Sequence, residues 1–197
     1  MKNLFKTLLI GGCITLFAGC ASTVHTAVNK TALDAGSKWA LLPITNNTDT
    51  PQAALAAEAI VEHQLRMRGL TALQHYPVTL SRDSLFEPSE RKVVEDAKKW
   101  AKTQGVRFGV TGSVEEWRYK VGIDGEPAVG VSLLVVDLSN DNVVWSASGA
   151  KTGWSRHALS ATAQNLLADM IGNLSLTRET TTAPTSTTAP SSSTKSK

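Results

Sequence analysis

The chain has 197 residues, of which 42% are apolar, so it can bury one good core, and its length gives no reason for a second domain. Its formal net charge is +3, but the first 19 residues supply two lysines, and residues 20–176 hold 15 basic against 16 acidic side chains. A balance this close to zero excludes the basic field that a nucleic-acid-binding domain requires.

The first 19 residues have the plan of an export signal. Two lysines precede an apolar run over 8–17 that is too short to span a bilayer, and small residues follow it. Because a cysteine comes next, residues 16–20 look like a bacterial lipobox, although Phe17 stands where a smaller residue is more usual. Cys13 could compete, but it would leave an apolar core of only about five residues. We therefore predict a lipoprotein signal peptide that ends before Cys20, the residue that is lipidated.

The mature chain keeps no cysteine besides Cys20, so no disulfide can form in the oxidising periplasm. Ala21, rather than an aspartate, follows the cysteine, and in proteins that this lipobox resembles that residue favours sorting to the outer membrane. Residues 20–36 are small and polar without a period, so we predict a tether between the lipid anchor and a folded domain over 37–175. The last segment, 176–197, is rich in Thr, Ser and Pro and is predicted to be disordered.

The first half of the domain predicts a strand over 39–44 and a helix over 51–68. Thr50 can cap this helix because its side chain can accept from free backbone N–H groups, and Pro51 fits the first helical position. Gly69 supplies the left-handed residue that ends it. The broad apolar face of the helix is expected to pack on the sheet.

Two further helices are predicted in the second half and near the end of the chain. Residues 71–74 form a short strand at best, and 75–88 are predicted to be an irregular surface loop because prolines interrupt them. Apolar residues at helical spacing then predict a helix over 89–104. A last helix is predicted over 155–174, where leucines and a methionine form one apolar face that closes the core.

The middle of the chain, residues 108–154, predicts three consecutive antiparallel strands. β-Branched and aromatic residues recur in short runs that are separated by turn signals at 122–127 and 139–142. The run 129–138 is apolar on both faces toward its end, so helices must cover at least one side of the sheet. The apolar positions change parity at the acidic pair 115–116, which predicts a β-bulge there. The predicted fold class is a single α/β domain with a mixed sheet, an antiparallel meander and about three flanking helices.

The sequence offers no constellation of residues for catalysis, a metal or a cofactor. No free cysteine remains as a nucleophile, and the histidines are not at metal-ligand spacing: His25, His63, His75 and His157. Glu115 and Glu116 are adjacent carboxylates, but neighbours on a strand point to opposite faces, which does not suit two carboxyls that flank one glycosidic bond. A bulge could bring them together, and solvated edge charges are the simpler interpretation. We predict that the protein is not an enzyme.

Five short runs carry a resemblance to a known family. They are VTGSVEEWRYKVG at 110–122, DGEPAVG at 124–130, WSASG at 145–149, WALLP at 39–43 and TPQA at 50–53. Together they resemble the Pel polysaccharide export lipoproteins of the PelC family over about residues 20–174. The hairpin over 137–145 is less specific, because it is also similar to hairpins in TolB amino-terminal and CsgG-like lipoproteins. The Thr/Ser/Pro tail departs from the family pattern.

The resemblance implies a lipoprotein that is held at the periplasmic face of the outer membrane by its amino-terminal lipid. In the family, about a dozen copies of the α/β domain form a ring, and an acidic surface draws a cationic, partly deacetylated amino-sugar polysaccharide through it. The polymer, a component of biofilms, then reaches a separate outer-membrane β-barrel porin, and no catalysis is involved. The alternative is a monomeric TolB- or CsgG-like lipoprotein that binds a partner in another export system.

Trp154 is the residue that we single out for contact with the membrane. The other tryptophans fall in predicted strands or on an apolar helix face: Trp39, Trp100, Trp117 and Trp145. Trp154 instead lies in a polar junction between Lys151 and Arg156, where the ring suits the lipid headgroup level and both cations can meet phosphates. The position also matches the tryptophan of the family's proposed aromatic belt. Packing onto the last helix near Leu159 is the alternative.

Asp124 and Glu126 are the acidic side chains that we expect to face the polysaccharide. They lie at the tip of a predicted hairpin turn, and binding residues gather on exposed loops of this kind. Glu115 and Glu116 extend this set along the preceding strand. The alternative is that Asp124 and Glu126 are ordinary solvated turn residues.

Overall fold

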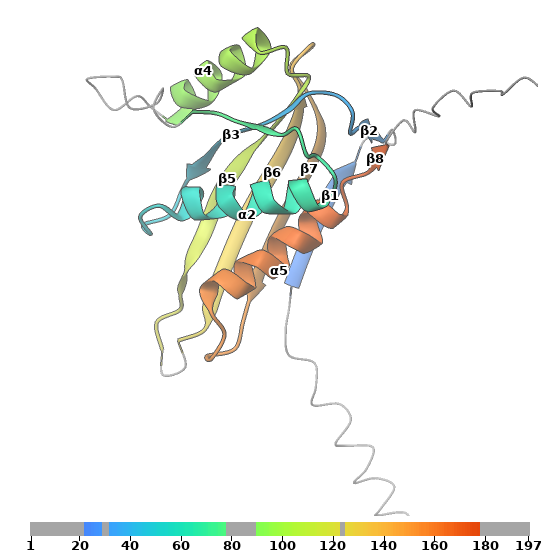
Figure 1. Ribbon diagram of the computed structural model, residues 1–197. Coiled ribbons are helices and arrows are strands. Elements are labelled where there is room, and N and C mark those ends of the chain that lie inside the picture. Colours follow the sequence, from blue (N-terminus) through green and yellow to red (C-terminus); the bar gives the residue numbers. More distant parts are fainter. Residues whose placement is uncertain (1–21, 29–31, 78–89, 123–124, 178–197) are drawn as a thin grey trace, which may run out of the picture.

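The computed structural model describes residues 22–28, 32–77, 90–122 and 125–177, which form an α/β domain (Figure 1). The strands of its main sheet are β1 (Ser22–Val28), β3 (Trp39–Asn46), β4 (Gln74–His75), β5 (Phe108–Tyr119), β6 (Pro127–Asp137) and β7 (Asn142–Thr152). The helices that flank this sheet are α2 (Ala53–Met67), α4 (Glu90–Thr103) and α5 (Leu159–Gly172). A separate pair consists of β2 (Leu33–Asp34) and β8 (Leu176–Thr177). The predicted α/β class and its three helices are confirmed.

The main sheet is mixed, with the strand order β1-β7-β6-β5-β3-β4. β3 runs parallel to β4 and β5, whereas β5, β6, β7 and β1 pair antiparallel in succession. The predicted meander is therefore confirmed. The predicted bulge is also present, because the pairing of β5 with β6 shifts its register between Val114 and Glu116.

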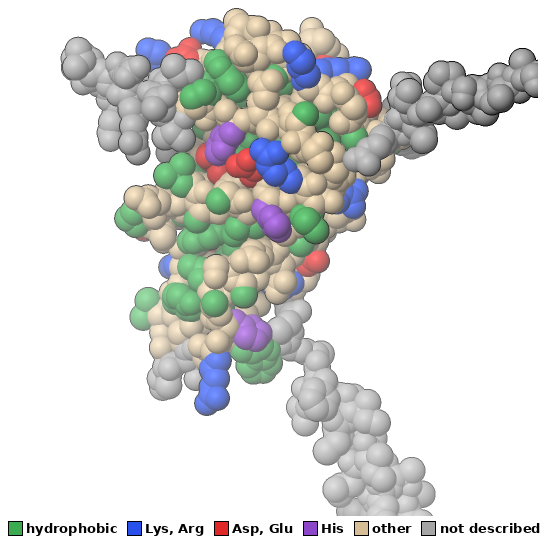
Figure 2. Space-filling view, viewed as in Figure 1, with side chains coloured by type: hydrophobic (Ala, Val, Ile, Leu, Met, Phe, Trp, Pro, Cys, Tyr) green, Lys and Arg blue, Asp and Glu red, His purple; other side chains and the backbone are tan. Residues whose placement is uncertain are grey.

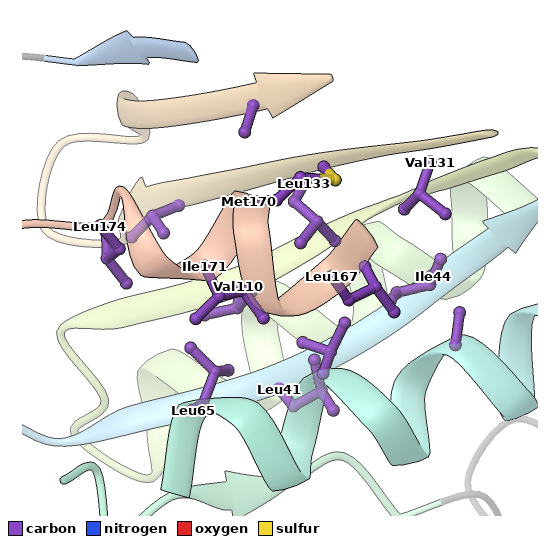
Figure 3. Packing of buried hydrophobic residues seen from close by; sticks show 14 of the residues in the cluster. Leu41, Ile44, Leu65, Val110, Val131, Leu133, Leu167, Met170, Ile171 and Leu174 are labelled. Atoms are coloured by element: carbon purple, nitrogen blue, oxygen red, sulfur yellow. The ribbon is translucent and has the colours of Figure 1, made fainter. Parts of the chain in front are cut away.

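The larger core lies between the sheet and the two helices α2 and α5, which cover one face side by side (Figures 1 and 3). Strand residues such as Leu41 and Leu133 meet Leu65 from α2 and Leu167 from α5, and all four are buried. Burial of one such side chain contributes about 1.5–3 kcal/mol. This layer supplies most of the apolar burial in the domain.

α4 packs on the opposite face of the sheet, but only at one end (Figure 1). There Ala97 and Ala101 form a second, smaller cluster with Leu42, Val136 and Leu138. This confirms that β6 is covered on both faces toward its end, because Val135 belongs to the larger core and Val136 to the smaller one.

The predicted tether is wrong for residues 22–28, which form the edge strand β1. All seven residues pair with β7, from Ser22 opposite Lys151 to Val28 opposite Trp145. Val24 packs against the larger core. An edge strand pairs with only one neighbouring strand and packs only one of its sides on the core. A short run of small residues without a clear period can therefore form such a strand. β2 and β8 likewise lie outside the predicted limits of 37–175, since β2 precedes them and β8 follows them.

Several helix ends differ from the prediction. α2 begins at Ala53, and its N-cap is Gln52 with a left-handed φ of 61° and no side-chain capping bond. Thr50 is not the cap, because the helix begins at Ala53 and Gln52 occupies that position; the Thr50 hydroxyl donates instead to the Trp117 carbonyl oxygen at 2.5 Å. α5 begins at Leu159 rather than 155, since the preceding residues form a turn.

The predicted surface loop after α2 is wrong at its start, since β4 occupies Gln74–His75 and Tyr76 is 6% exposed. The remainder of that loop from residue 78 lies outside the described residues. So do Asp124, the signal segment with Cys20, and the chain from residue 178 onward.

A buried carboxylate ties α2 to the sheet. Glu58 is 5% exposed, and one oxygen accepts a hydrogen bond from the Ile44 N–H at 2.8 Å, while the other lies 3.3 Å from His75 Nε2. His75 Nδ1 lies 3.3 Å from Glu62, which pairs in turn with Arg66. Burial is the main reason that the pKa of Glu58 is raised above its ordinary value. The carboxyl group of Glu58 therefore binds a proton more tightly in the folded domain than in the unfolded chain.

Glu58→Ala should lower the free energy of unfolding by about 2–3 kcal/mol, because it leaves the buried Ile44 N–H without its acceptor. Glu62→Ala is the matched control on the same helix and should cost less than about 1 kcal/mol, since this carboxylate is partly exposed. Urea denaturation measures both values, and equal losses in the two variants would contradict the role given to Glu58.

The free energy of unfolding of the wild type should also fall as the pH rises from below the ordinary pKa of Glu58 to above its raised value. That part of the pH dependence should be absent from Glu58→Gln.

Candidate membrane-contact site

The pairing of β1 with β7 brings the start of the described chain to the same end of the sheet as Trp154. Ser22 lies opposite Lys151, and Trp154 follows Lys151 by three residues. Figure 1 shows the first residue of β1 and the loop between β7 and α5 at one end of the sheet. Cys20 precedes Ser22 by two residues, so a lipid on this cysteine would be attached at the Trp154 end.

The hairpin between β5 and β6 reaches the same end and is fastened to the loop that contains Trp154. The Gly153 N–H donates to the Pro127 carbonyl oxygen at 2.9 Å, and the Leu159 N–H donates to the Tyr119 hydroxyl oxygen at 3.0 Å. The two segments therefore form one surface, which we call the Trp154 end. Its described residues are 119–122 and 125–126 of the hairpin and 153–158 of the loop.

Apolar side chains are exposed at the Trp154 end to an unusual degree. Exposure is 59% for Trp154, 49% for Tyr119 and 102% for Val121. These three make up half of the large exposed hydrophobic residues of the described chain, the others being Leu55, Met67 and Val143. Burial against the last helix, the alternative for Trp154, does not account for a ring that stays more than half exposed. Exposed aromatic rings with aliphatic groups beside them are typical of residues that lie at a membrane interface.

Basic residues accompany these apolar groups. Lys120 and Arg156 are exposed, and hydrophobic and basic side chains gather at this lower end of the molecule in Figure 2. Lys151 was predicted to meet phosphates. Its ammonium group lies 3.3 Å from the Asp169 carboxylate of α5, so it already forms an ion pair within the domain. Arg156 is thus the better placed of the two predicted cations for a lipid headgroup.

The acidic residues predicted to face a polysaccharide fall into two places. Glu126 is partly exposed in the hairpin at the Trp154 end. Glu115 and Glu116 lie higher on the sheet and line one hollow of about 480 Å³. Their predicted placement on opposite faces is therefore wrong, because the bulge turns both toward the same space.

These two carboxylates are already engaged within the domain. The Asn47 side-chain amide donates to the oxygens of Glu115 at 3.0 and 3.1 Å, and the Ser113 hydroxyl donates to the same group. Glu116 accepts from Arg118 at 3.1 Å. Within the described ranges no group of three or more His, Cys, Asp or Glu side chains could hold a metal ion. No helix there is long and apolar enough to cross a membrane.

Sequence reasoning singled out Trp154 as a candidate but not its exposed neighbours Tyr119 and Val121. Both belong to the run of odd apolar positions after the bulge, which indicated burial rather than exposure. β5 extends beyond the cover of the helices, so these residues leave the core. The sequence did offer one signal of this exposure: in the run after the bulge, the charged residue Lys120 lies between the two apolar residues.

Comparison with known proteins identifies the family. No family model and no curated protein matches the chain. Among solved structures, the PelC dodecamer from Paraburkholderia phytofirmans is 39% identical with a TM-score of 0.67, and the match covers 80% of this chain and 99% of that chain. A variant of that dodecamer in another crystal form gives 39% identity and a TM-score of 0.68, with 80% and 100% covered.

A more distant likeness concerns the fold alone. The lipoprotein GNA1162 from Neisseria meningitidis is 15% identical with a TM-score of 0.53, over 69% of this chain and 96% of that chain. The PelC match is of a different kind, because the two chains are 39% identical and the match covers 99% of that chain. On this ground the present chain belongs to the PelC family.

Proposed function

We propose that this protein is an outer-membrane lipoprotein subunit of a Pel polysaccharide export complex. Anchored by Cys20 at the periplasmic face, about a dozen copies form a ring that guides the cationic amino-sugar polymer toward an outer-membrane porin. The dodecameric state of the PelC relatives supports the oligomer over a monomeric TolB- or CsgG-like lipoprotein. The function requires no catalysis.

One observation carries this proposal: the start of β1, Trp154 and the β5–β6 hairpin converge at one end of the sheet. A lipid near Ser22 and a partly exposed tryptophan would then meet the same bilayer, with Arg156 beside the headgroups. The lipid anchor and the exposed ring would act on the same membrane, and stable anchoring needs more than one such signal. The strands would stand roughly upright on the membrane, with α4 farthest from it.

Trp154→Ala should reduce polymer export while it leaves the melting temperature within about 2 °C of the wild type, because an exposed ring contributes little to the core. Val143→Ala is the matched control, since this residue is 50% exposed at the other end of β7. Secreted polymer and thermal unfolding by circular dichroism measure the two effects. Full export by Trp154→Ala with a native melting temperature would refute membrane contact through this residue.

Asp124 and Glu126 remain our proposal for carboxylates that attract the polymer, with Glu115 and Glu116 as secondary candidates because both are already hydrogen-bonded. The double variant Asp124→Lys, Glu126→Lys should bind deacetylated polymer several-fold more weakly at low salt, and the difference should shrink at high salt, where such attraction is screened. Glu95→Lys with Asp96→Lys on α4 gives the same change of charge at the other end of the domain. Equal binding by both double variants would remove the hairpin from the polymer site.

A further inference from the structure

The outward face of α2 is mostly apolar, although it is exposed, and its charged residues Glu62 and Arg66 form an ion pair with each other beside the apolar ones. We call it the α2 stripe; its residues are Leu55, Ala56, Ala59, Ile60, His63 and Met67. Leu55 is 45% and Met67 72% exposed. Figure 2 shows hydrophobic side chains along the middle of this view, where α2 lies in Figure 1.

α4 provides the comparison within the same molecule. Its solvent-facing side carries Lys92, Glu95, Lys99 and Lys102, as expected for a helix that remains in water. A helix that is apolar on its outer side as well is normally covered by another element. The difference between the two helices indicates that α2 is covered in the assembled protein and α4 is not.

A second surface, most of whose side chains are small and uncharged, lies on the opposite side of the sheet, with Glu115 at the edge of its hollow. α4 covers only one end of that side, and below it, among the described residues, the sheet presents small side chains to solvent. We call this region the open face; its residues are Thr23, His25, Ser132, Ser146, Ser148 and Ala150. The Ser132 and Ser148 hydroxyls hydrogen-bond across the strands at 3.0 Å, and a hollow of about 240 Å³ runs beside them. Side chains this short allow another element to approach the sheet closely.

The two surfaces match in size, and most of their side chains are uncharged. α2 has 15 residues, so it is about 22 Å long and, with side chains, about 10 Å wide. Four strands, β1, β7, β6 and β5, spaced about 4.8 Å apart, offer a width of about 14 Å. Charged residues adjoin both surfaces, but each has a partner: Arg66 pairs with Glu62 beside the α2 stripe, and Glu115, which lines the hollow of the open face, accepts hydrogen bonds from Asn47 and Ser113. Contact between the two surfaces would therefore bury no charged group that lacks a partner.

We propose that the α2 stripe of one subunit packs against the open face of the next copy of this chain. The inference rests on the proposed ring, and the dodecameric PelC relatives supply the reason to commit to a second copy. A closed ring uses two different patches on each subunit, and with about a dozen copies neighbours turn by only about 30°, so the patches face nearly opposite ways. The α2 stripe and the open face do so, since the sheet lies between them.

This packing is also compatible with the membrane end. The two surfaces face along the normal of the sheet, whereas the Trp154 end points along the strands (Figure 1). Subunits stacked face to back can therefore all present Trp154 to one plane. A head-to-tail arrangement of this kind keeps every subunit upright.

Cross-linking of full-length protein in membranes tests the contact. Ala59→Cys lies in the α2 stripe and Ser148→Cys in the open face, and a short bifunctional maleimide can join them. The double variant should give a ladder of covalent oligomers, and each single variant should give none. Co-expression of the two single variants should give dimers only, because each carries one half of the contact. A ladder from Thr26→Cys with Gln74→Cys instead, on the edge strands β1 and β4, would overturn the proposal in favour of edge-to-edge pairing.

A charge placed in the contact provides an independent readout. Ala59→Glu should convert the detergent-extracted oligomer into monomers by light scattering while the melting of the secondary structure is retained. Lys99→Glu on α4 is the matched control and should leave the oligomer intact. A wild type that is itself monomeric would refute the proposed ring. An oligomeric wild type whose mass is unchanged by Ala59→Glu, with no ladder from the double cysteine variant, would refute only this interface.

Discussion

Replacing Gly112 with alanine is expected to prevent the domain from folding normally. Gly112 lies in β5 opposite Leu133 of β6, at the centre of the meander. A Cβ atom at this position would run into the Ser132 carbonyl oxygen and lie 3.0 Å from its carbonyl carbon and 3.1 Å from the Leu133 Cα. These are backbone atoms of the neighbouring strand, so the clash cannot be relieved by a change of rotamer.

The expected cost of Gly112→Ala is more than about 3 kcal/mol, a large share of the roughly 5–15 kcal/mol that stabilises a domain. For a chain of this size, that corresponds to a fall in melting temperature of about 10 °C. Gly122→Ala is the matched control, because a Cβ there meets nothing within 4 Å. Thermal unfolding of both variants by circular dichroism tests the expectation. Melting of Gly112→Ala at the temperature of Gly122→Ala would show that β6 can move away at little cost.

Cys20→Ser is expected to abolish lipidation and polymer export together. Without the acyl chains, each domain would rely on the Trp154 end alone, and a single weak interfacial contact does not hold a protein on a membrane. Feeding cells with labelled palmitate, followed by membrane fractionation, should show no label on this variant, which should be unprocessed or mislocalised. Cys13→Ser should keep both label and export. Label that persists on Cys20→Ser would mean that the lipid is attached to another cysteine.

Much of the fold could be predicted because its pattern is local. The bulge in β5 is visible as a change of parity at residues 115–116, and the cover on both faces of β6 is visible in the run 129–138. β1 could not be predicted, because its pairing depends on β7, more than a hundred residues later. The cap of α2 was also missed, since the helix begins two residues after Pro51 and its N-cap, Gln52, makes no side-chain capping bond.

The candidate membrane site was only partly visible in the sequence. Trp154 was found because a large aromatic residue in a polar junction lacks apolar neighbours along the chain. Tyr119 and Val121 join it through a contact between Tyr119 and Leu159, which are forty positions apart. That the amino-terminal strand arrives at the same end follows from its direction in the sheet, and a single sequence does not reveal strand direction.

A lipid on Cys20 would hold the domain very close to the surface of the bilayer. Only Ala21 separates that cysteine from β1, and two extended residues span about 7 Å. Trp154 would then meet the bilayer intramolecularly, at an effective concentration of the millimolar order that is typical of short linkers. Under that condition a contact of about 1 kcal/mol in each subunit is useful, because contacts from neighbouring copies add up. The tilt of the assembly and its height above the lipid would be set by many weak contacts acting at once, and the loss of one tryptophan in a mixed oligomer would change them little.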